Sequence, residues 1–421
     1  MPRLVLPRPA AASLLALVVA TIAAGCATRP APARPDATPD VAHHRDDRFQ
    51  NRHIEFGTKS IEDFLRWRFL AWRNGLPPPP REPIPTIAPD RAFIATNARA
   101  GALMQPAVTW IGHATVLVQA GGLNVLTDPI FSERASPLDF VGPKRHQPPA
   151  LSIDELPRID AVVISHDHYD HCDLRSLVAL ARQAGGAPLF LVPLGVGDLL
   201  RSAGIQRVVE LDWWRSHALA GARGAVEFTL TPVQHWSGRR LDDRMRTLWG
   251  GWAILAPDLH VYHAGDTAWS RDFADTRAFF AERQSPARGG GFDIALLPIG
   301  AYEPRWFMRD SHVNPEEAVA IHDAIGAKRT LGVHWGTFPL SDEPLDEPPR
   351  ALAEARRLRG VPDDEFFLLP IGGTRVLEGR RIARPGGLQR QATPVMQNQA
   401  HPLSLRVGKI GRAEPGKEPS E

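Results

Sequence analysis

Short apolar runs alternate with longer amphipathic stretches through the middle of the chain. Residues 107–111 (AVTWI) and 115–118 (TVLV) are rich in β-branched and aromatic side chains, a composition typical of strands. Residues 174–184 and 315–325 are predicted to be helices, and the second follows Asn314, a favoured helix N-cap residue. The alternation predicts a mixed α/β domain in which helices pack on sheets.

One apolar run is followed at once by a concentration of potential metal ligands. Residues 159–164 (IDAVVI) have the β-branched composition of a buried strand, and the sequence S-H-D-H-Y-D-H follows at 165–171. The motif therefore lies on the loop at the carboxyl end of a strand. The side chains that this loop can offer to a metal ion are those of His166, His168, Asp170 and His171.

Three further strand-like segments each end at another potential ligand. The segments and ligands are 225–234 with His235, 259–265 with Asp266, and 330–333 with His334. Imidazole suits zinc, and a carboxylate between two ions can bridge them. A single histidine is more often an ordinary polar loop residue, but this set of strand-end ligands favours a dinuclear site with positions left open for water and substrate.

The H-x-H-x-D-H pattern resembles the signature of the metallo-β-lactamase superfamily. The resemblance implies a four-layer αβ/βα sandwich with the site at one edge, between the two sheets, and two Zn²⁺ ions per chain. It assigns His166, His168 and His235 to one ion. It assigns Asp170, His171 and His334 to the other, with Asp266 as the bridge.

Longer blocks of sequence resemble the N-acylphosphatidylethanolamine-hydrolysing phospholipase D family, in the same order along residues 50–380. The blocks are TWIGHAT at 109–115, LTDPIFS at 126–132, VGPKR at 141–145, LWG at 248–250, PIGAYEPRWFM at 298–308, residues 312–319, and HWGTF at 334–338. The family implies a zinc-dependent phosphodiesterase in which a metal-bound hydroxide attacks a membrane phospholipid. The products would be an N-acylethanolamine or a related headgroup and phosphatidic acid.

Several residues outside the ligand set have roles that the resemblance suggests. Asp128 corresponds to a carboxylate that orients a ligating imidazole, although a turn-forming Asp before a proline is an equally good interpretation. With Asp170 and Asp266, His312 is assigned to catalysis, as a phosphate contact or a proton donor to the leaving alkoxide. The alternative for His312 is an exposed loop histidine.

Two other positions are less specific. His113 either lines the site or packs beneath it. Lys144 and Arg145 could meet lipid phosphate, but a solvated pair is the commoner explanation for adjacent basic residues.

Residues 64–73 (FLRWRFLAWR) mix aromatic and aliphatic side chains with three arginines. Such a helix could lie in a membrane interface, with its apolar groups at the headgroup boundary and its guanidinium groups on phosphates. Because apolar residues lie all around the segment, packing on the sandwich is the favoured interpretation.

The amino terminus resembles a bacterial lipoprotein signal. Basic residues precede a short apolar stretch at 10–24, and the sequence IAAG leads directly to Cys26. We expect residues 1–26 to be this signal, Cys26 to carry the lipid, and 27–47 to be a flexible tether. An ordinary cleaved signal or an anchor helix is the alternative.

A lipid anchor at Cys26 would place the protein in the bacterial cell envelope, and we expect it on the periplasmic face of the outer membrane. With Cys26 lipidated, Cys172 has no partner for a disulfide. The hydrolase domain is expected at residues 48–384, and the Gly-, Pro- and Gln-rich residues 385–421 are expected to be a disordered tail.

Composition narrows the list of partners. The formal net charge is +2, from 49 basic and 47 acidic residues, so no strong field favours nucleic acid. The expected partners are membrane phospholipids, as substrate and through the anchor, and a homodimer stays open.

One departure from the family pattern bears on the substrate. Family members carry a Gln-Tyr pair near the Gly-Pro-Lys block, whereas this chain has Asp139 and Phe140, so ordinary and N-acylated phospholipids both stay open. A lactonase or small-ester hydrolase is the second enzyme hypothesis. A lipid-binding lipoprotein without activity is the third, and the complete ligand set argues against it.

Overall fold

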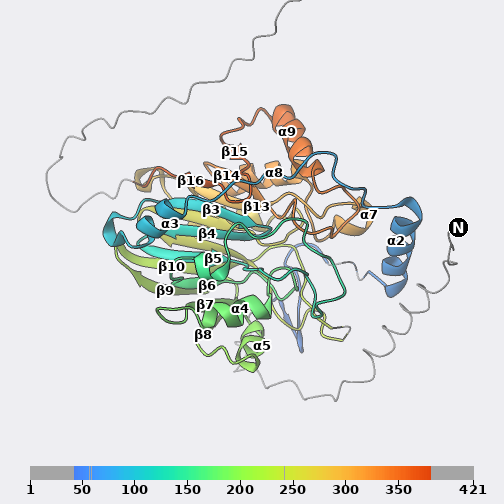
Figure 1. The fold of residues 1–421 in the computed structure, drawn as a ribbon, viewed down its shortest axis with the longest axis horizontal. Coiled ribbons are helices and arrows are strands. Elements are labelled where there is room, and N and C mark those ends of the chain that lie inside the picture. Colours follow the sequence, from blue (N-terminus) through green and yellow to red (C-terminus); the bar gives the residue numbers. More distant parts are fainter. Residues whose placement is uncertain (1–41, 56, 58, 241, 381–421) are drawn as a thin grey trace, which may run out of the picture. The chain divides into compact units, whose positions relative to one another are not determined.

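A computed structural model of the protein describes residues 42–380, apart from 56, 58 and 241 (Figure 1). The predicted signal at 1–26 with Cys26, residues 27–41 of the predicted tether, and the predicted tail at 385–421 lie outside the described residues. No helix in the described ranges is both long enough and apolar enough to cross a bilayer.

Two seven-stranded sheets form the centre of the domain, and each combines antiparallel and parallel neighbours. The strands of the first sheet, in spatial order, are β16 (Thr374–Val376), β3 (Ala107–Gly112), β4 (Thr115–Ala120), β5 (Leu123–Thr127), β6 (Ala161–Val163), β7 (Leu189–Pro193) and β8 (Val208–Leu211). In this order, neighbouring strands from β16 to β5 are antiparallel and those from β5 to β8 are parallel.

The second sheet is likewise divided into an antiparallel and a parallel part. Its strands in spatial order are β15 (Phe366–Phe367), β14 (Thr330–Val333), β13 (Ile294–Pro298), β12 (Leu259–His263), β11 (Gly251–Ala256), β10 (Gly224–Thr231) and β9 (Ser216–Gly221). Neighbouring strands from β9 to β12 are antiparallel, and those from β12 to β15 are parallel. The two halves of the domain therefore repeat one arrangement that is not visible in the sequence.

Alternating side chains divide the apolar residues of the first sheet between two cores. Val116 and Val118 belong to the core shared with the second sheet, whereas Leu117 between them belongs to the core beneath the outer helices. This is the two-residue period of a strand that is buried on both faces. Both faces of the sheet are therefore covered.

Helices form the two outer layers (Figure 1). Those on the first sheet contribute to its outer core and are α3 (Arg91–Ala98), α4 (Leu174–Ala181) and α5 (Val196–Ser202). Those that pack on the second sheet are α6 (Asp272–Phe280), α8 (Pro315–Ile325) and α9 (Glu347–Arg359). The order helix, sheet, sheet, helix is the predicted four-layer αβ/βα sandwich.

The predicted elements are close to the observed ones. The strands predicted at 107–111 and 115–118 are β3 and β4, and α8 has the predicted limits. Asn314 caps α8 by accepting a hydrogen bond from the backbone N–H of Glu317. The helix predicted at 174–184 ends earlier, at Ala181, where the chain turns toward β7.

The amino-terminal part of the described chain is more ordered than the sequence indicated. β1 (His44–Arg45) and β2 (Arg48–Phe49) pair as a hairpin within the predicted tether and just beyond it. The Nε2 atoms of His43 and His44 lie 2.7 and 2.8 Å from the two carboxylate oxygens of Asp212. These long-range contacts attach residues 43 and 44 to the chain segment that follows β8.

The remaining elements are short or lie outside the layers. They are α2 (Ile61–Asn74), α7 (Arg305–Met308), and the 3-10 turns η1 (Gly101–Leu103), η2 (Ile153–Glu155) and η3 (Pro286–Arg288).

Candidate metal centre

All of the predicted metal ligands meet at one edge of the sandwich, at the carboxyl ends of strands. The loop after β6 supplies four of them, and the other three follow β10, β12 and β14. Parallel strands end at a common edge of their sheet, so ligands distant in the sequence come together there. The residues are His166, His168, Asp170, His171, His235, Asp266 and His334.

The first cluster consists of three imidazoles. His168 Nδ1 lies 2.8 Å from His166 Nε2 and 3.3 Å from His235 Nε2. Burial, together with neighbouring imidazoles, holds the pKa values of His166 and His168 well below the usual histidine range. Burial likewise lowers the pKa of His235 to about 4. These imidazoles are therefore neutral near pH 7, which is the form that binds metals.

Two of these imidazoles have contacts outside the cluster through Nδ1, which leaves Nε2 facing the cluster. His235 Nδ1 donates to the carbonyl oxygen of Ser311 at 2.8 Å, so its Nε2 keeps a lone pair. His166 Nδ1 lies 2.9 Å from Ser165 Oγ. His168 Nδ1 can carry at most one proton, yet it faces two ring nitrogens. A cation at this point would accept the lone pairs of His166 Nε2, His168 Nδ1 and His235 Nε2. The cluster therefore fits a metal ion.

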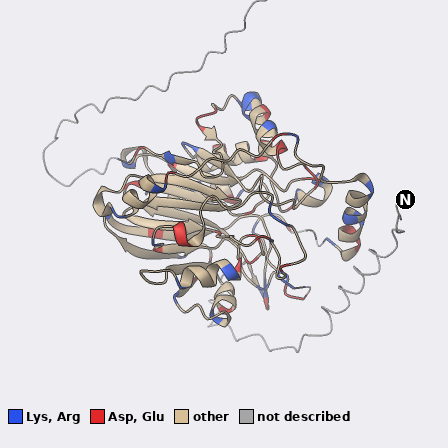
Figure 2. Cartoon of the chain, viewed as in Figure 1, with Lys and Arg blue, Asp and Glu red and all other residues tan. Residues whose placement is uncertain are grey.

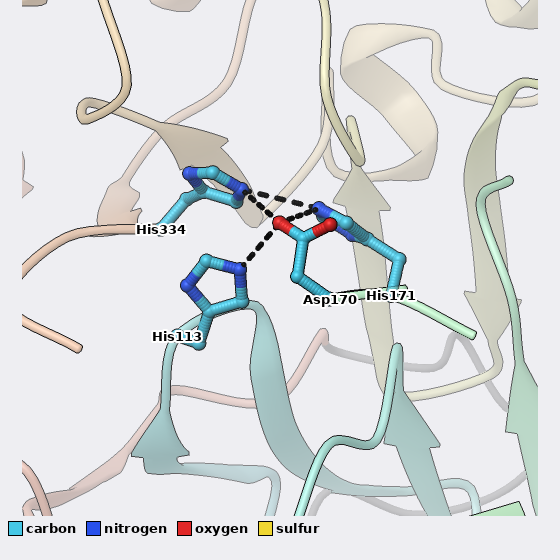
Figure 3. A group of neighbouring side chains, drawn as sticks. All are labelled: His113, Asp170, His171 and His334. Carbon is cyan, nitrogen blue, oxygen red and sulfur yellow. Dashed lines mark hydrogen bonds and ion pairs between the residues drawn. The ribbon is translucent and has the colours of Figure 1, made fainter. Parts of the chain in front are cut away.

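The second cluster contains a carboxylate and three imidazoles (Figure 3). Asp170 Oδ2 lies 3.0 Å from His113 Nε2, 3.3 Å from His334 Nε2 and 3.4 Å from His171 Nε2. The Nε2 atoms of His171 and His334 are 3.1 Å apart. Imidazole and carboxylate together are a donor set that suits zinc.

Asp266 lies between the two clusters. Its Oδ2 is 3.2 Å from His171 Nε2 and 4.0 Å from His166 Nε2, and its Oδ1 is 3.1 Å from His334 Nε2. Burial opposes the charged form, but the imidazoles of His171, His334 and His312 hold the pKa of the Asp266 carboxyl well below its usual range. An ionised carboxylate at this position can bridge two cations.

Asp128 lies beneath the second cluster, where its predicted role requires it. Asp128 Oδ2 accepts hydrogen bonds at 2.8 Å from His171 Nδ1 and at 2.6 Å from Ser165 Oγ. Its Oδ1 accepts from the Ser165 backbone N–H at 2.7 Å. With Nδ1 donating to this carboxylate, His171 presents Nε2 as the ligand atom. Asp128 thus joins the ligand loop to the end of β5.

His312 faces the same centre from the loop between α7 and α8. Its Nδ1 lies 3.8 Å from Asp266 Oδ2, is buried, and has no hydrogen-bond partner. The side chain is 15% exposed, whereas that of Asp266 is 2% exposed. His312 is therefore placed to meet a molecule that enters the site.

Two further histidines belong to the site, and only one of them is named by the sequence analysis. His113, for which the sequence allows lining the site or packing beneath it, lies against Asp170 in the second cluster. His263 was read only as part of a strand, but its Nε2 lies 2.8 Å from Asp128 Oδ2. The available signal was position, because both residues stand at the end of a strand.

The two basic residues of the 141–145 block have structural contacts. Arg145 donates to the carbonyl oxygens of Ile130 and Ser132, and burial lowers its pKa to about 10. Lys144 Nζ lies 3.7 Å from an oxygen of Glu133, and both side chains are exposed. Arg145 therefore fixes its loop, and Lys144 is the solvated residue of the pair.

The comparisons with known proteins agree with the fold. The beta-lactamase superfamily domain matches residues 123–335, a range that contains all of the predicted ligands. The chain belongs to the metallo-β-lactamase superfamily and is a metal-dependent hydrolase of that superfamily.

Three relatives place the chain more closely. An uncharacterised protein of Mycobacterium tuberculosis is 42% identical over 302 residues, which cover 70% of this chain and 73% of that protein. The N-acyl-phosphatidylethanolamine-hydrolyzing phospholipase D 1 of Caenorhabditis elegans is 38% identical over 274 residues, 63% of this chain and 74% of that protein. A UPF0173 metal-dependent hydrolase of Nitratidesulfovibrio vulgaris is 30% identical over 277 residues, 65% and 97% respectively. The resemblance to the N-acylphosphatidylethanolamine-hydrolysing phospholipase D family is thus confirmed.

Proposed function

We propose that the protein is a phospholipase D-type phosphodiesterase that binds two zinc ions and acts on membrane phospholipids. The observation that carries the proposal is the pair of ligand clusters that share Asp266. The similarity to the Caenorhabditis elegans phospholipase D supports the choice of a phosphodiester as substrate. N-acylated phosphatidylethanolamine is the first substrate to test.

The ligand set has a clear use in phosphodiester hydrolysis. Two zinc ions held by the clusters would act as Lewis acids toward the phosphate oxygens and lower the pKa of water to about 7. The chain's own contribution is to hold the ligands in a fixed arrangement before substrate arrives. The bonds of Asp128 to His171 and Ser165 do this for the loop after β6.

His312 is the residue we assign to the leaving group. In the reaction, the water oxygen forms a bond to phosphorus, the bond from phosphorus to the headgroup oxygen breaks, and that oxygen gains a proton. Burial lowers the pKa of His312 to about 3, so the imidazole is neutral near pH 7 and has one N–H, which can bind a phosphate oxygen or donate to the headgroup oxygen as it leaves. The backbone of His312 is held in place because its amide N–H donates to the Met308 carbonyl at 2.9 Å and its carbonyl oxygen accepts from the Arg305 guanidinium at 2.8 Å.

The site of bond cleavage tests the proposal. Hydrolysis of N-acylated phosphatidylethanolamine in ¹⁸O-labelled water should place the label in phosphatidic acid and leave the released N-acylethanolamine unlabelled. The Asp266→Ala variant, purified in the same way, controls for contaminating lipases.

Two other outcomes would contradict the proposal. Label in a free fatty acid would indicate hydrolysis of an acyl ester or amide. Turnover of a small ester or lactone without turnover of any diacyl phospholipid would favour the lactonase hypothesis.

The position of residues 139–140 leaves the headgroup preference to experiment. Asp139 pairs with Arg175 at the start of α4, and Phe140 is 76% exposed on the loop before the Gly-Pro-Lys block. Ordinary phosphatidylethanolamine should therefore be assayed beside its N-acylated form.

We also propose that the protein is attached to the periplasmic face of the bacterial outer membrane through Cys26. The support is the sequence alone, in which a short apolar stretch leads directly to this cysteine. The Cys26→Ser variant should lose incorporation of labelled fatty acid. A mature protein that begins elsewhere and takes up no fatty acid would contradict this part of the proposal.

A further inference from the structure

Helix α2 exposes more apolar surface than it buries. Ile61, Leu65, Phe69 and Trp72 recur every three or four residues, so they lie on one side of the helix. Their exposed fractions are 67%, 59%, 56% and 76%. The sequence-based expectation that the segment packs on the sandwich therefore holds for only one side of the helix.

The opposite side of α2 is the one that packs on the domain. Its buried residues are Trp67 and Ala71. The Trp67 ring stacks on Phe307 at 4.7 Å, and its Nε1 donates to Asp342 at 2.9 Å. An amphipathic helix of a globular protein normally turns its apolar stripe toward the core, whereas α2 also carries one toward solvent.

Arginines accompany the exposed stripe (Figure 2). Arg66, Arg68 and Arg73 are exposed, and the Arg66 guanidinium lies 5.4 Å from the centre of the Trp306 ring. Trp306, in α7, is itself 46% exposed. Guanidinium groups next to exposed tryptophans match the phosphates and the interfacial region of a bilayer.

The packing of α2 connects this surface to the candidate metal centre. Trp67 stacks on Phe307 of α7, and α7 leads directly to His312. α2 and α7 also lie on the same side of the domain in Figure 1. A bilayer bound to α2 would therefore lie close to the loop that carries His312.

We infer that the outward side of α2, together with Trp306, binds the surface of an anionic phospholipid bilayer. This interaction surface consists of the exposed stripe, Arg66, Arg68, Arg73 and Trp306. The inference rests on the proposed function in one respect, namely that the substrate is a membrane lipid. It is independent of the predicted lipid at Cys26.

A fluorescent label on the stripe can test the inference locally. Leu65→Cys is introduced into the full chain with Cys26→Ser, so that the only other cysteine is the buried Cys172. An environment-sensitive fluorophore at position 65 should shift to the blue with phosphatidylglycerol vesicles and respond less to phosphatidylcholine vesicles. Because the label reports its own surroundings, membrane contact by another segment does not reproduce the result.

Helix α9 offers a matched control. Leu358 is 64% exposed and stands between Arg357 and Arg359, but it is the one exposed large apolar side chain in the described residues of α9. The same label at Leu358→Cys should not shift. A shift at both positions would show adsorption without a specific surface and would overturn the inference.

Two variants of the labelled protein separate the apolar and the charged contributions. Trp72→Ala should raise the phosphatidylglycerol concentration at half saturation by about tenfold. Arg66→Ala combined with Arg68→Ala should raise it by about tenfold or more and should have little effect on the weaker phosphatidylcholine response. If the phosphatidylglycerol concentration at half saturation were the same in both variants as in the labelled parent protein, the inference would be contradicted.

Other occupants of the surface would give different results, each of which overturns the inference. A blue shift that appears without lipid and grows with protein concentration would indicate a second copy of the chain. A label that is already shifted at high dilution would indicate coverage by another segment of the same chain.

Failure of the membrane-binding surface can be distinguished from failure of the proposed function. If the label shifts on vesicles but no phospholipid is hydrolysed, the surface stands and the proposed function fails. If a short-chain, monomeric phosphodiester is hydrolysed but the label does not shift, the proposed function stands and the surface fails.

Discussion

The two ligand clusters of the candidate metal centre are built differently. The first contains imidazoles alone, and burial keeps the pKa values of His166 and His168 low. The second contains Asp170 beside three imidazoles. There burial opposes protonation, but nearby carboxylates raise the pKa of His171 well above the usual range and that of His334 to about 9.

The difference shows what stabilises each half of the site. The second cluster balances its charges internally, through Asp170, Asp266 and the Asp128 beneath it. The first cluster has no carboxylate other than the shared Asp266, and His235 is oriented by the backbone carbonyl of Ser311. Changes to outer residues should therefore affect the second cluster most, whereas loss of the bridge should affect both clusters strongly.

The largest effect is expected from the bridge. Asp266→Ala should remove the contact between the clusters, release metal from both, and lower kcat/KM by about 10³-fold or more, a loss of several kcal/mol of transition-state stabilisation. Elemental analysis and phospholipid hydrolysis measure the two effects. A variant that retained its metal and most of its activity would contradict the bridging role.

Asp128→Asn should act mainly on the second cluster. The amide cannot accept from His171, His263 and Ser165 as the carboxylate does, so His171 loses its fixed orientation. The loss of metal affinity should be about 10- to 100-fold. Titration with a competing chelator should show one weakened ion and one nearly unchanged. Equal weakening of both ions would show that the clusters are not separate.

His113 should have a smaller effect, also confined to the second cluster. Burial and the adjacent His334 lower the pKa of His113 to about 3, so the neutral ring can donate only one hydrogen bond, to Asp170. His113→Ala should weaken the second ion by up to about tenfold. His113→Gln, which keeps a donor, should recover part of the loss. Equal behaviour of the two variants would argue against hydrogen bonding as the cause.

The smallest expected effect is that of metal removal on the alkylation of Cys172. Cys172 follows His171, is fully buried, and has a pKa raised by burial to about 12. The thiol is protonated at pH 8 and should resist alkylation in the native protein. It should also resist after metal removal, because the Asp128 carboxylate accepts hydrogen bonds from His171 and Ser165 that hold the loop. Mass spectrometry of the peptide that contains Cys172 checks this; rapid alkylation after chelation would show that metal orders the loop.

The residues that the sequence predicts as ligands come together in the structure because they follow strands. Apolar runs locate strand ends, and β6, β12 and β14 each deliver a ligand where expected. His263 was missed because a histidine inside a strand pattern looks like any buried polar residue. Its contact is with Asp128, which is 135 positions away in the chain.

The less predictable features depend on contacts between distant segments. Residues 42–47 lack apolar periodicity, and their order comes from bonds between two histidines and Asp212. For α2, the sequence showed apolar residues all around the helix. Only the stacking of Trp67 on Phe307 shows which side packs and which remains exposed.

The central claim is that the two clusters hold two ions at once. The most direct measurement is the metal content of purified, active protein, by elemental analysis combined with native mass spectrometry of the intact chain. The account predicts about two zinc or similar ions per chain. Full activity in protein that carries one ion, or only traces of metal, would contradict it.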